Sequence, residues 1–280
     1  MTYKTKRIAA ITMARNDEFF LSRWIEYYGA AFGKENLYIY LDGTDQVIPK
    51  NAGAAHIKKL PHTPMSRAAG DKYRIDLISD MAADLFARGY DVVIGCDTDE
   101  FLVIDPGFGM TLREYLSRDN LPAVISGLGL DVGQHMENEK TINPKKPLLD
   151  DRGYALLSTR YTKPVVLTRP ARWGRGFHRV KSHNFHLDKN LYLLHFGAID
   201  MEMLKQKAAA RGADWVAHLN RRGNGTIDAV TNSRPRGDAA IKFARILQRI
   251  ARPIYAWNKP GMLGLKIVVK IPENLRKIKI

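Results

Sequence analysis

The sequence predicts an α/β protein with a mixed, mainly parallel sheet flanked by helices. The chain begins with an apolar run at Arg7–Met13 (RIAAITM). Leu21, Trp24 and Tyr28 then recur at the spacing of one helix face, and a second apolar run follows at Leu37–Leu41 (LYIYL). Strand, helix and strand in this order form the repeating unit of parallel sheets, so this first segment sets the predicted class.

Later segments repeat the alternation of helix and strand. Tyr90–Cys96 is apolar almost throughout, which is typical of a strand that is buried on both faces. A helix from about Ala69 to Ala87 precedes this strand, with apolar residues along one stripe. Further strands are expected at His56–Leu60, Ala123–Ser126 and Leu191–His195.

Charge is distributed unevenly along the chain. The net charge is +15, and residues 201–280 carry 17 Lys or Arg against 5 Asp or Glu. We therefore divide the chain into a nearly neutral domain, residues 1–200, and a basic, largely helical C-terminal extension, residues 201–280. A helix at Ala239–Ala251 concentrates part of this charge. Polyanions such as nucleic acid or an anionic membrane surface attract such a region.

The cysteine content and the apolar runs indicate a compartment. Cys96 is the one cysteine, which excludes an internal disulfide and a cysteine-based zinc site and favours a reducing cytoplasm. The N-terminal residues have no long apolar segment of the kind found in signal peptides, so we expect a first strand there. No run of about 18 apolar residues occurs, and no spanning helix is expected. We expect a cytoplasmic protein that can lie on the cytoplasmic face of the inner membrane.

Polar or acidic side chains follow three of the expected strands. They are Arg15–Asp17, Asp42 and Asp97–Asp99. In open α/β sheets ligands bind at the carboxyl ends of the strands, so these clusters should meet at one edge. Two carboxylates in an Asp-x-Asp turn can hold Mg²⁺ or Mn²⁺ while substrate phosphates complete the coordination shell. An isolated Asp-x-Asp is more often a solvated turn, but here apolar segments on both sides favour a metal site.

Three quoted segments carry a resemblance to a known family. ARNDEFFLSRWIEYYGAAFG, IYLDGTDQ and DTDEFL (Asp97–Leu102) resemble nucleotide-sugar glycosyltransferases of the GT-A fold. The closest are family-2-like bacterial enzymes related to glycosyltransferase family 92. Those enzymes have an Asn-Glu-x-x-x-Leu-x-Glu-Trp-Ile-x-Tyr-His-like helix, an Asp-rich turn after the second strand and an Asp-x-Asp-Glu-Phe-Leu metal motif. The similarity covers roughly Ile8 to Val103, is weaker beyond that range and is absent from the basic tail.

The resemblance implies a donor site in residues 1–200, which would form the GT-A catalytic domain. Arg15 and Asn16 would line the nucleoside pocket, and Asp42 would contact the base or ribose. Lys72 and Arg74 would face the diphosphate. The donor would be a nucleotide-sugar, with a UDP-sugar favoured.

The resemblance also implies a metal centre. Asp97 would lie near the ribose and the metal, and Asp99 would be the firmer ligand to Mn²⁺ or Mg²⁺. Many GT-A enzymes add a late histidine, for which His195 at an expected strand end is the first choice and His178 the second. A packing role is the competing interpretation of either histidine.

An inverting enzyme, which the resemblance favours, also needs a carboxylate base. Asp131 follows an expected strand, and Glu137 and Glu139 lie in Gly133–Asp151, a polar stretch that predicts a long loop. A solvated loop acid is the competing interpretation of each, and the sequence does not decide among them. The aromatic residues Tyr161, Trp173 and Phe177 could stack on a sugar or belong to the core.

Together these observations predict a metal-dependent glycosyltransferase of cell-surface glycan synthesis. It would move a sugar from a nucleotide-sugar to a saccharide or lipid-linked acceptor. One alternative is a metal-dependent nucleotidyltransferase or phosphohydrolase, although the first strand is not followed by a Gly-rich phosphate loop. Another is a polyanion-binding protein. We expect no nucleic-acid partner, because the tail has no known recognition motif and few interleaved aromatics. An anionic membrane surface is the expected partner of residues 201–280.

Overall fold

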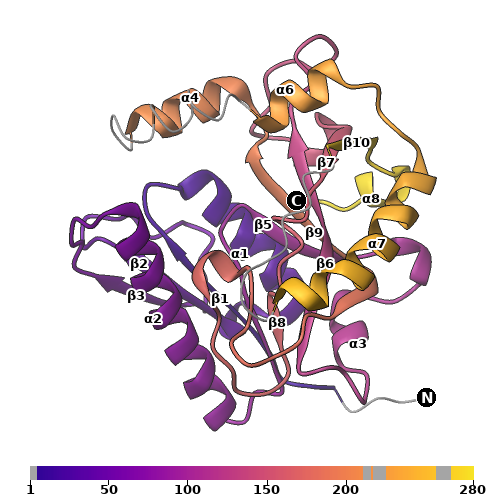
Figure 1. Ribbon diagram of the computed structural model, residues 1–280. Helices are drawn as coiled ribbons and strands as arrows, with labels where there is room; N and C mark the ends of the chain where they lie inside the picture. Colours follow the sequence, from indigo (N-terminus) through magenta and orange to yellow (C-terminus); the bar gives the residue numbers. More distant parts are fainter. Residues whose placement is uncertain (1–4, 211–215, 217–224, 257–265) are drawn as a thin grey trace.

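The chain folds into a mixed, largely open sheet of ten strands that is flanked by helices (Figure 1). A computed structural model of the protein describes residues 5–210, 216, 225–256 and 266–280. The predicted α/β class with a mixed sheet is therefore confirmed. No helix in these ranges is both long enough and apolar enough to span a bilayer.

Parallel strands form the first part of the sheet. They are, in order, β3 (His56–Leu60), β2 (Leu37–Asp42), β1 (Ile8–Ala14) and β4 (Val92–Gly95). β1 pairs with β2 on one side and with β4 on the other, so the carboxyl ends of these strands lie at one edge. The two connecting helices are α1 (Glu18–Phe32) and α2 (Arg67–Ala87).

Alternate residues of β1 face two different helices, which explains why the strand is apolar throughout. Ile8 and Ala10 pack in one core with α1, whereas Ala9 and Ile11 pack in a second core with α2. A strand covered on both faces has no solvated side, so its sequence shows no polar alternation.

The second part of the sheet is mostly antiparallel, so the prediction of a mainly parallel sheet is wrong there. β6 pairs parallel with β9, but β5 with β9, β4 with β8, β6 with β7 and β8, and β10 with β7 are antiparallel. Loops rather than helices join several of these strands. Such connections favour antiparallel neighbours, because parallel neighbours need a long crossover that is usually a helix. The bounds are β5 (Glu100–Ile104), β6 (Val124–Gly133), β7 (Tyr154–Leu157), β8 (Val166–Leu167), β9 (Leu187–Ala198) and β10 (Ile267–Lys270).

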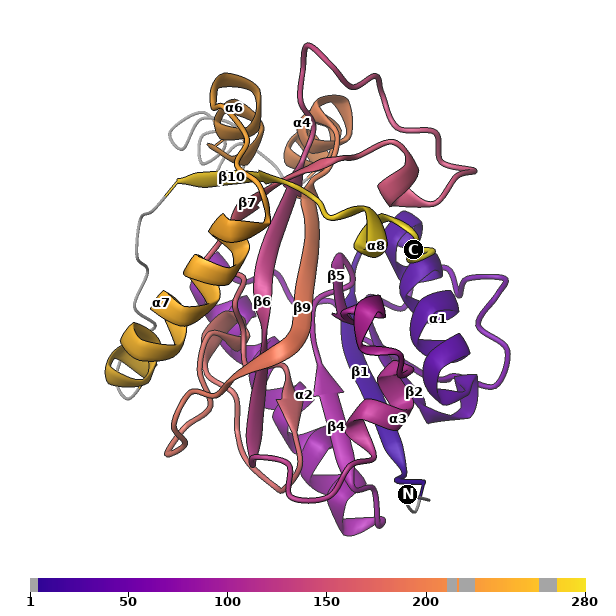
Figure 2. The ribbon, with the colours of Figure 1, turned by 90° about the vertical axis from the view of Figure 1, so that its right-hand side faces the viewer.

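The residues after Asp200 add to the same sheet and core. β10 pairs with β7, and Val269, Ile271 and Leu275 pack in the core that contains α1. The division of the chain into a domain and a C-terminal extension at residue 200 stays a prediction. Figure 2 shows α7 on one side of β6 and β9 and α1 on the other. The remaining helices are α3 (Leu112–Leu116), α4 (Met201–Ala210), α6 (Gly225–Asn232), α7 (Asp238–Ala256) and α8 (Glu273–Arg276).

A buried ion pair joins the long loop after β6 to the end of β9. Arg152 Nη2 lies 3.2 Å from Asp200 Oδ2, and the two side chains are 0% and 1% exposed. Arg152 Nη1 also donates to the Lys140 carbonyl at 2.9 Å. The other Asp200 oxygen accepts from the backbone amides of Glu202 and Met203 in the first turn of α4. One pair of side chains therefore fixes both the loop and the start of α4.

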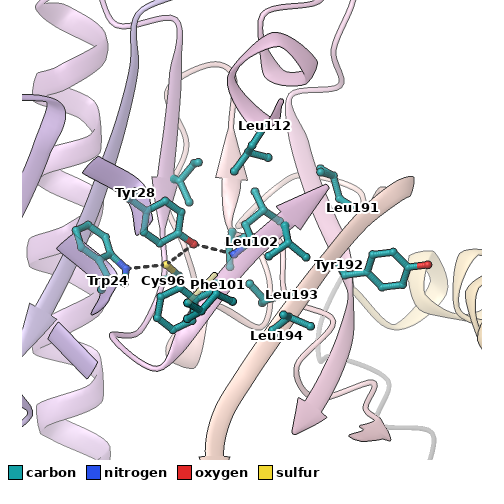
Figure 3. Close-up of a cluster of buried hydrophobic side chains, with 14 of the residues drawn as sticks. Trp24, Tyr28, Cys96, Phe101, Leu102, Leu112, Leu191, Tyr192, Leu193 and Leu194 are labelled. Carbon is teal, nitrogen blue, oxygen red and sulfur yellow. Dashed lines mark hydrogen bonds between the residues drawn. The ribbon is translucent and has the colours of Figure 1, made fainter. Parts of the chain in front are cut away.

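Cys96, at the end of β4, is held by α1 (Figure 3). Its Sγ lies 3.4 Å from Trp24 Nε1, which donates to it, and 3.5 Å from the Tyr28 hydroxyl. The same hydroxyl accepts from the Leu102 amide at 2.8 Å. Burial, reinforced by the nearby Glu100 carboxylate, raises the pKa of Cys96 to about 12, so the group remains a thiol at neutral pH. These contacts fix both ends of the turn between β4 and β5.

We predict that Tyr28→Phe lowers the free energy of unfolding by about 1–3 kcal/mol, because the buried Leu102 N–H loses its acceptor. Tyr27→Phe is the matched control. The Tyr27 hydroxyl donates to the Leu102 carbonyl, and a carbonyl tolerates the loss of one partner better than an amide does. Urea denaturation of both variants measures the difference, and equal losses would contradict this account of the turn.

Candidate active site

The turns after β1 and β4 touch at the carboxyl edge of the sheet. The Thr98 hydroxyl donates to Asp17 Oδ2 at 2.7 Å. Asp17 occupies the N-cap position of α1, but its side chain makes no capping hydrogen bond. It turns instead toward Thr98 and toward Lys207 of α4, whose Nζ lies 3.2 Å away. The carboxylate thus joins the two turns rather than capping the helix.

Asp97 is neutralised by two basic side chains. Arg74 of α2 pairs with Asp97 Oδ1, and Lys163 Nζ lies 3.0 Å from Asp97 Oδ2. Lys163 also lies 2.5 Å from Glu100 Oε1, and the Lys163 and Glu100 side chains are 3% and 0% exposed. One buried ammonium therefore serves two carboxylates, which relieves the repulsion between them.

Glu100, His195 and Asp131 form a row across three strands. His195 of β9 is opposite Glu100 of β5 on one side and opposite Asp131 of β6 on the other. Residues directly opposite one another share a face of the sheet. His195 Nδ1 lies 2.6 Å from Asp131 Oδ1, and Nε2 lies 3.8 Å from Asp99 Oδ2. The imidazole thus bridges Asp131 and the predicted metal ligand Asp99.

Asp131 lies within β6 rather than after a strand, because β6 continues to Gly133, well beyond the predicted Ala123–Ser126. Both of its carboxylate oxygens are engaged. Oδ1 meets His195, and Oδ2 accepts a hydrogen bond of 2.5 Å from the Thr226 hydroxyl of α6. The side chain is 7% exposed, so this carboxylate is a fixed and buried group.

The surroundings of His195 fix its ring. The Tyr161 ring stacks on the imidazole with 3.6 Å between centroids. A Cβ at Gly197 would lie 2.5 Å from the imidazole Cε1, so a side chain at this position would collide with the ring. Burial, with Asp131 and Asp99 nearby, raises the pKa of Tyr161 well above its usual value, and its hydroxyl stays protonated.

The charge of His195 depends on its neighbours. Burial lowers its pKa, but the carboxylates of Asp99, Asp131 and Glu100 raise it by more, so the net pKa lies above the ordinary value. The imidazole is therefore drawn toward its charged form between these acids.

The residues predicted to hold the nucleoside are close to one another. Asn16 has a left-handed backbone (φ 49°), its amide donates to Gln46 Oε1 at 2.7 Å, and Gln46 Nε2 donates to Asn16 Oδ1 at 2.9 Å. Arg15 donates to the Asp42 carbonyl. His62 Nδ1 lies 3.0 Å from each Asp42 carboxylate oxygen. These contacts join the turns after β1 and β2.

Other predicted site residues have different surroundings. Lys72 pairs with Asp76 at 2.8 Å on the exposed face of α2, and this contact does not support a role at the diphosphate. Glu137 is exposed, whereas Glu139 accepts from the backbone amides of His135 and Gly153 at the two ends of its own loop. His178 Nδ1 lies 3.0 Å from the Arg160 carbonyl oxygen. Trp173, like Phe177, is buried in the core beside α2.

The structure adds residues that the sequence did not indicate, above all Lys163 and Lys207. Lys163 stands directly before the apolar run Pro164–Leu167, and this position was the one available signal. Lys207 lies on a helix of ordinary polar composition, and Lys207 Nζ is 3.8 Å from Asp99 Oδ2. Nothing in its local sequence distinguishes it from other surface lysines.

Two side chains of the site are placed to bind a divalent cation. Asp99 Oδ2 and His195 Nε2, 3.8 Å apart, are close enough to bind one ion together. Asp97 is occupied by Arg74 and Lys163, and no group of three carboxylate, imidazole or thiol side chains in the described part of the chain forms a complete site. Mg²⁺ and Mn²⁺ take the remaining ligands from water and substrate phosphates, so these two donors fit such an ion.

Two comparisons of the chain with known proteins gave no match. No protein-family model matches the sequence, and no curated protein matches it. The function is therefore inferred from the chemistry of the site.

We predict that Lys163→Met lowers the free energy of unfolding by about 3–5 kcal/mol, because Glu100 is then buried without its cation. Glu100→Gln should also be destabilising, since it leaves Lys163 with Asp97 alone. The double variant should lose clearly less than the sum of the two single losses. Urea denaturation of the four proteins gives the coupling energy, and additive losses would show that the pair does not act as a unit.

Proposed function

We propose that the protein is a metal-dependent glycosyltransferase of the GT-A type, which moves a sugar from a nucleotide-sugar to a saccharide or lipid-linked acceptor. One observation carries the proposal. The Asp97–Asp99 turn lies at the carboxyl edge of parallel strands, touches the turn after β1, and presents Asp99 to His195. A cation site beside basic side chains and the polar turns after β1 and β2 fits a nucleoside diphosphate.

The donor diphosphate would meet both a cation and basic side chains. Asp99 and His195 would hold Mn²⁺ or Mg²⁺, which neutralises charge on the leaving diphosphate when bound. Arg74, Lys163 and Lys207 now pair with acids of the site. Each can turn part of its hydrogen-bonding capacity to phosphate oxygens, since Arg has five donors and Lys has three. These residues would bind and orient the diphosphate.

The nucleoside would lie over the turns after β1 and β2. Asn16 and Gln46 present amide groups that can recognise a base edge, and their mutual hydrogen bonds hold them in place. Asp42, with His62 against its carboxylate, can accept from ribose hydroxyls. A UDP-sugar is the favoured donor.

In the transfer step the acceptor oxygen bonds to the anomeric carbon. The bond from that carbon to the diphosphate oxygen breaks, its electron pair stays on the diphosphate, and the acceptor proton passes to a base. Asp131 is buried with both oxygens engaged, so we assign it to positioning His195 rather than to proton transfer. Among the predicted candidates for the base of an inverting reaction, Glu137 is exposed in the loop after β6, whereas Glu139 accepts from two backbone amides.

The protein should release nucleoside diphosphate from a nucleotide-sugar in the presence of Mn²⁺. A screen of UDP- and GDP-sugars measures this release, and CMP-sugars, which would release CMP, are screened beside them. Asp99→Asn should lower turnover about 100-fold or more, whereas Asp84→Asn, an exposed carboxylate paired with Arg88 on α2, should leave it unchanged. Release of nucleoside monophosphate from UDP- or GDP-sugars would indicate the nucleotidyltransferase or phosphohydrolase class instead. Full turnover by Asp99→Asn would contradict the assignment of the metal.

Asp131→Asn distinguishes a positioning residue from a base. If Asp131 orients His195, the variant should bind Mn²⁺ about 10–100-fold more weakly and recover much of its turnover at saturating Mn²⁺. A base would be missing at every Mn²⁺ concentration. Mn²⁺ titrations followed by thermal unfolding and by turnover report the two effects separately. If the variant binds Mn²⁺ as tightly as the wild type but has lost its turnover, Asp131 is the base and not a positioning residue.

A further inference from the structure

Helix α7 exposes an apolar stripe. Phe243, Ile246 and Ile250 are 55%, 60% and 69% exposed. Their spacing of three and four residues places them on one helical face. Large apolar side chains at this exposure have a cost in water, and a contiguous row of them marks an interaction surface.

The opposite face of α7 is fixed to the rest of the molecule. Ile241 and Ala244 are buried in the core that contains α1. Arg245 Nη1 donates to the backbone carbonyls of Asp188 and Leu191, at 2.5 and 2.9 Å. The helix, which lies beside β6 and β9 in Figure 2, is therefore anchored along one side. The exposed stripe lies on its other side.

Basic side chains flank the stripe. Lys242 and Arg249 are exposed and lie next to the stripe on the helical wheel, about 40–60° to one side of Ile246. Asp238, in the first turn, is the sole acidic residue in the sequence of α7, and residues 201–280 have an excess of 12 basic over acidic side chains. The apolar stripe thus borders a region of positive potential.

We infer that α7 docks on an anionic lipid bilayer, with Phe243, Ile246 and Ile250 entering the headgroup–acyl boundary and Lys242 and Arg249 meeting acidic headgroups. An apolar face beside a basic flank is the pattern of helices that lie in a membrane interface. Nucleic acid would match the charge but not the apolar stripe, because its binding surfaces are polar and basic. This inference does not depend on the proposed glycosyl transfer.

Flotation of the full chain with vesicles tests the inference. The protein should float with phosphatidylcholine vesicles that contain phosphatidylglycerol, and much less with phosphatidylcholine alone. Phe243→Ser/Ile246→Ser/Ile250→Ser should lower partitioning at least about tenfold. Lys242→Gln and Arg249→Gln should each lower partitioning about fivefold. A higher salt concentration should also lower partitioning, because salt screens the attraction to the acidic headgroups. Val47→Ser/Ile48→Ser, which removes exposed apolar side chains elsewhere, is the matched control and should float as the wild type does.

A second measurement places the helix at the membrane directly. Phe243→Trp should show a blue-shifted fluorescence on addition of the anionic vesicles, and circular dichroism checks that each variant is folded. Three results would overturn the inference. They are flotation unchanged by the stripe variant, binding of DNA or RNA without binding of vesicles, and a dimer that the stripe variant abolishes while vesicles stay unbound. Donor turnover in solution is measured separately, so failure of docking and failure of the proposed function are distinguishable.

Discussion

The pairing of acidic side chains at one edge of the sheet is the constraint on which the rest of the site depends. Carboxylates gathered in a partly buried space repel one another and lose hydration, so each needs a cation or a hydrogen-bond donor. The fold supplies these partners from elements that are distant in sequence: α2, the segment before β8, β9, α4 and α6. The carboxylates that are paired in this way are Asp17, Asp97, Asp99, Glu100 and Asp131. Each carboxylate at the edge is therefore balanced by a partner from the protein itself.

The buried pair of Arg152 and Asp200 has a related role at larger scale. Asp200 follows β9 and caps α4, and Arg152 holds the loop that follows β6. Since α4 carries Lys207, the position of this lysine beside Asp17 is set partly by an ion pair that is not itself in the site. Buried pairs contribute little net stability but fix geometry well when all their hydrogen bonds are made. The side chains after residue 200 are thus part of the site, although the sequence placed the site in residues 1–200.

Local patterns explain what the sequence could predict. The strands around β1, including His56–Leu60 with its bounds, follow from apolar runs and helical spacing, and the acidic turns follow from their ends. The antiparallel half of the sheet could not be predicted in this way. The pairing of β5 with β9 joins residues about ninety positions apart, and no local pattern in the sequence indicates it. The same limit applies to the site. Asp97 and Asp99 stand in a recognisable motif, whereas Lys163, Lys207 and Thr226 reach it through tertiary structure alone.

The burial of Cys96 has a practical consequence for work on this chain. It is the one cysteine in the sequence, is fully buried, and holds its proton at neutral pH. Thiolate is the form that reacts with maleimides and similar reagents, so the Cys96 thiol should stay unreactive while the protein is folded. A cysteine introduced on α7 or beside His195 could then carry a spectroscopic label without removal of the native one. Keeping Cys96 also preserves the contacts with Trp24 and Tyr28 that hold the acidic turn in place.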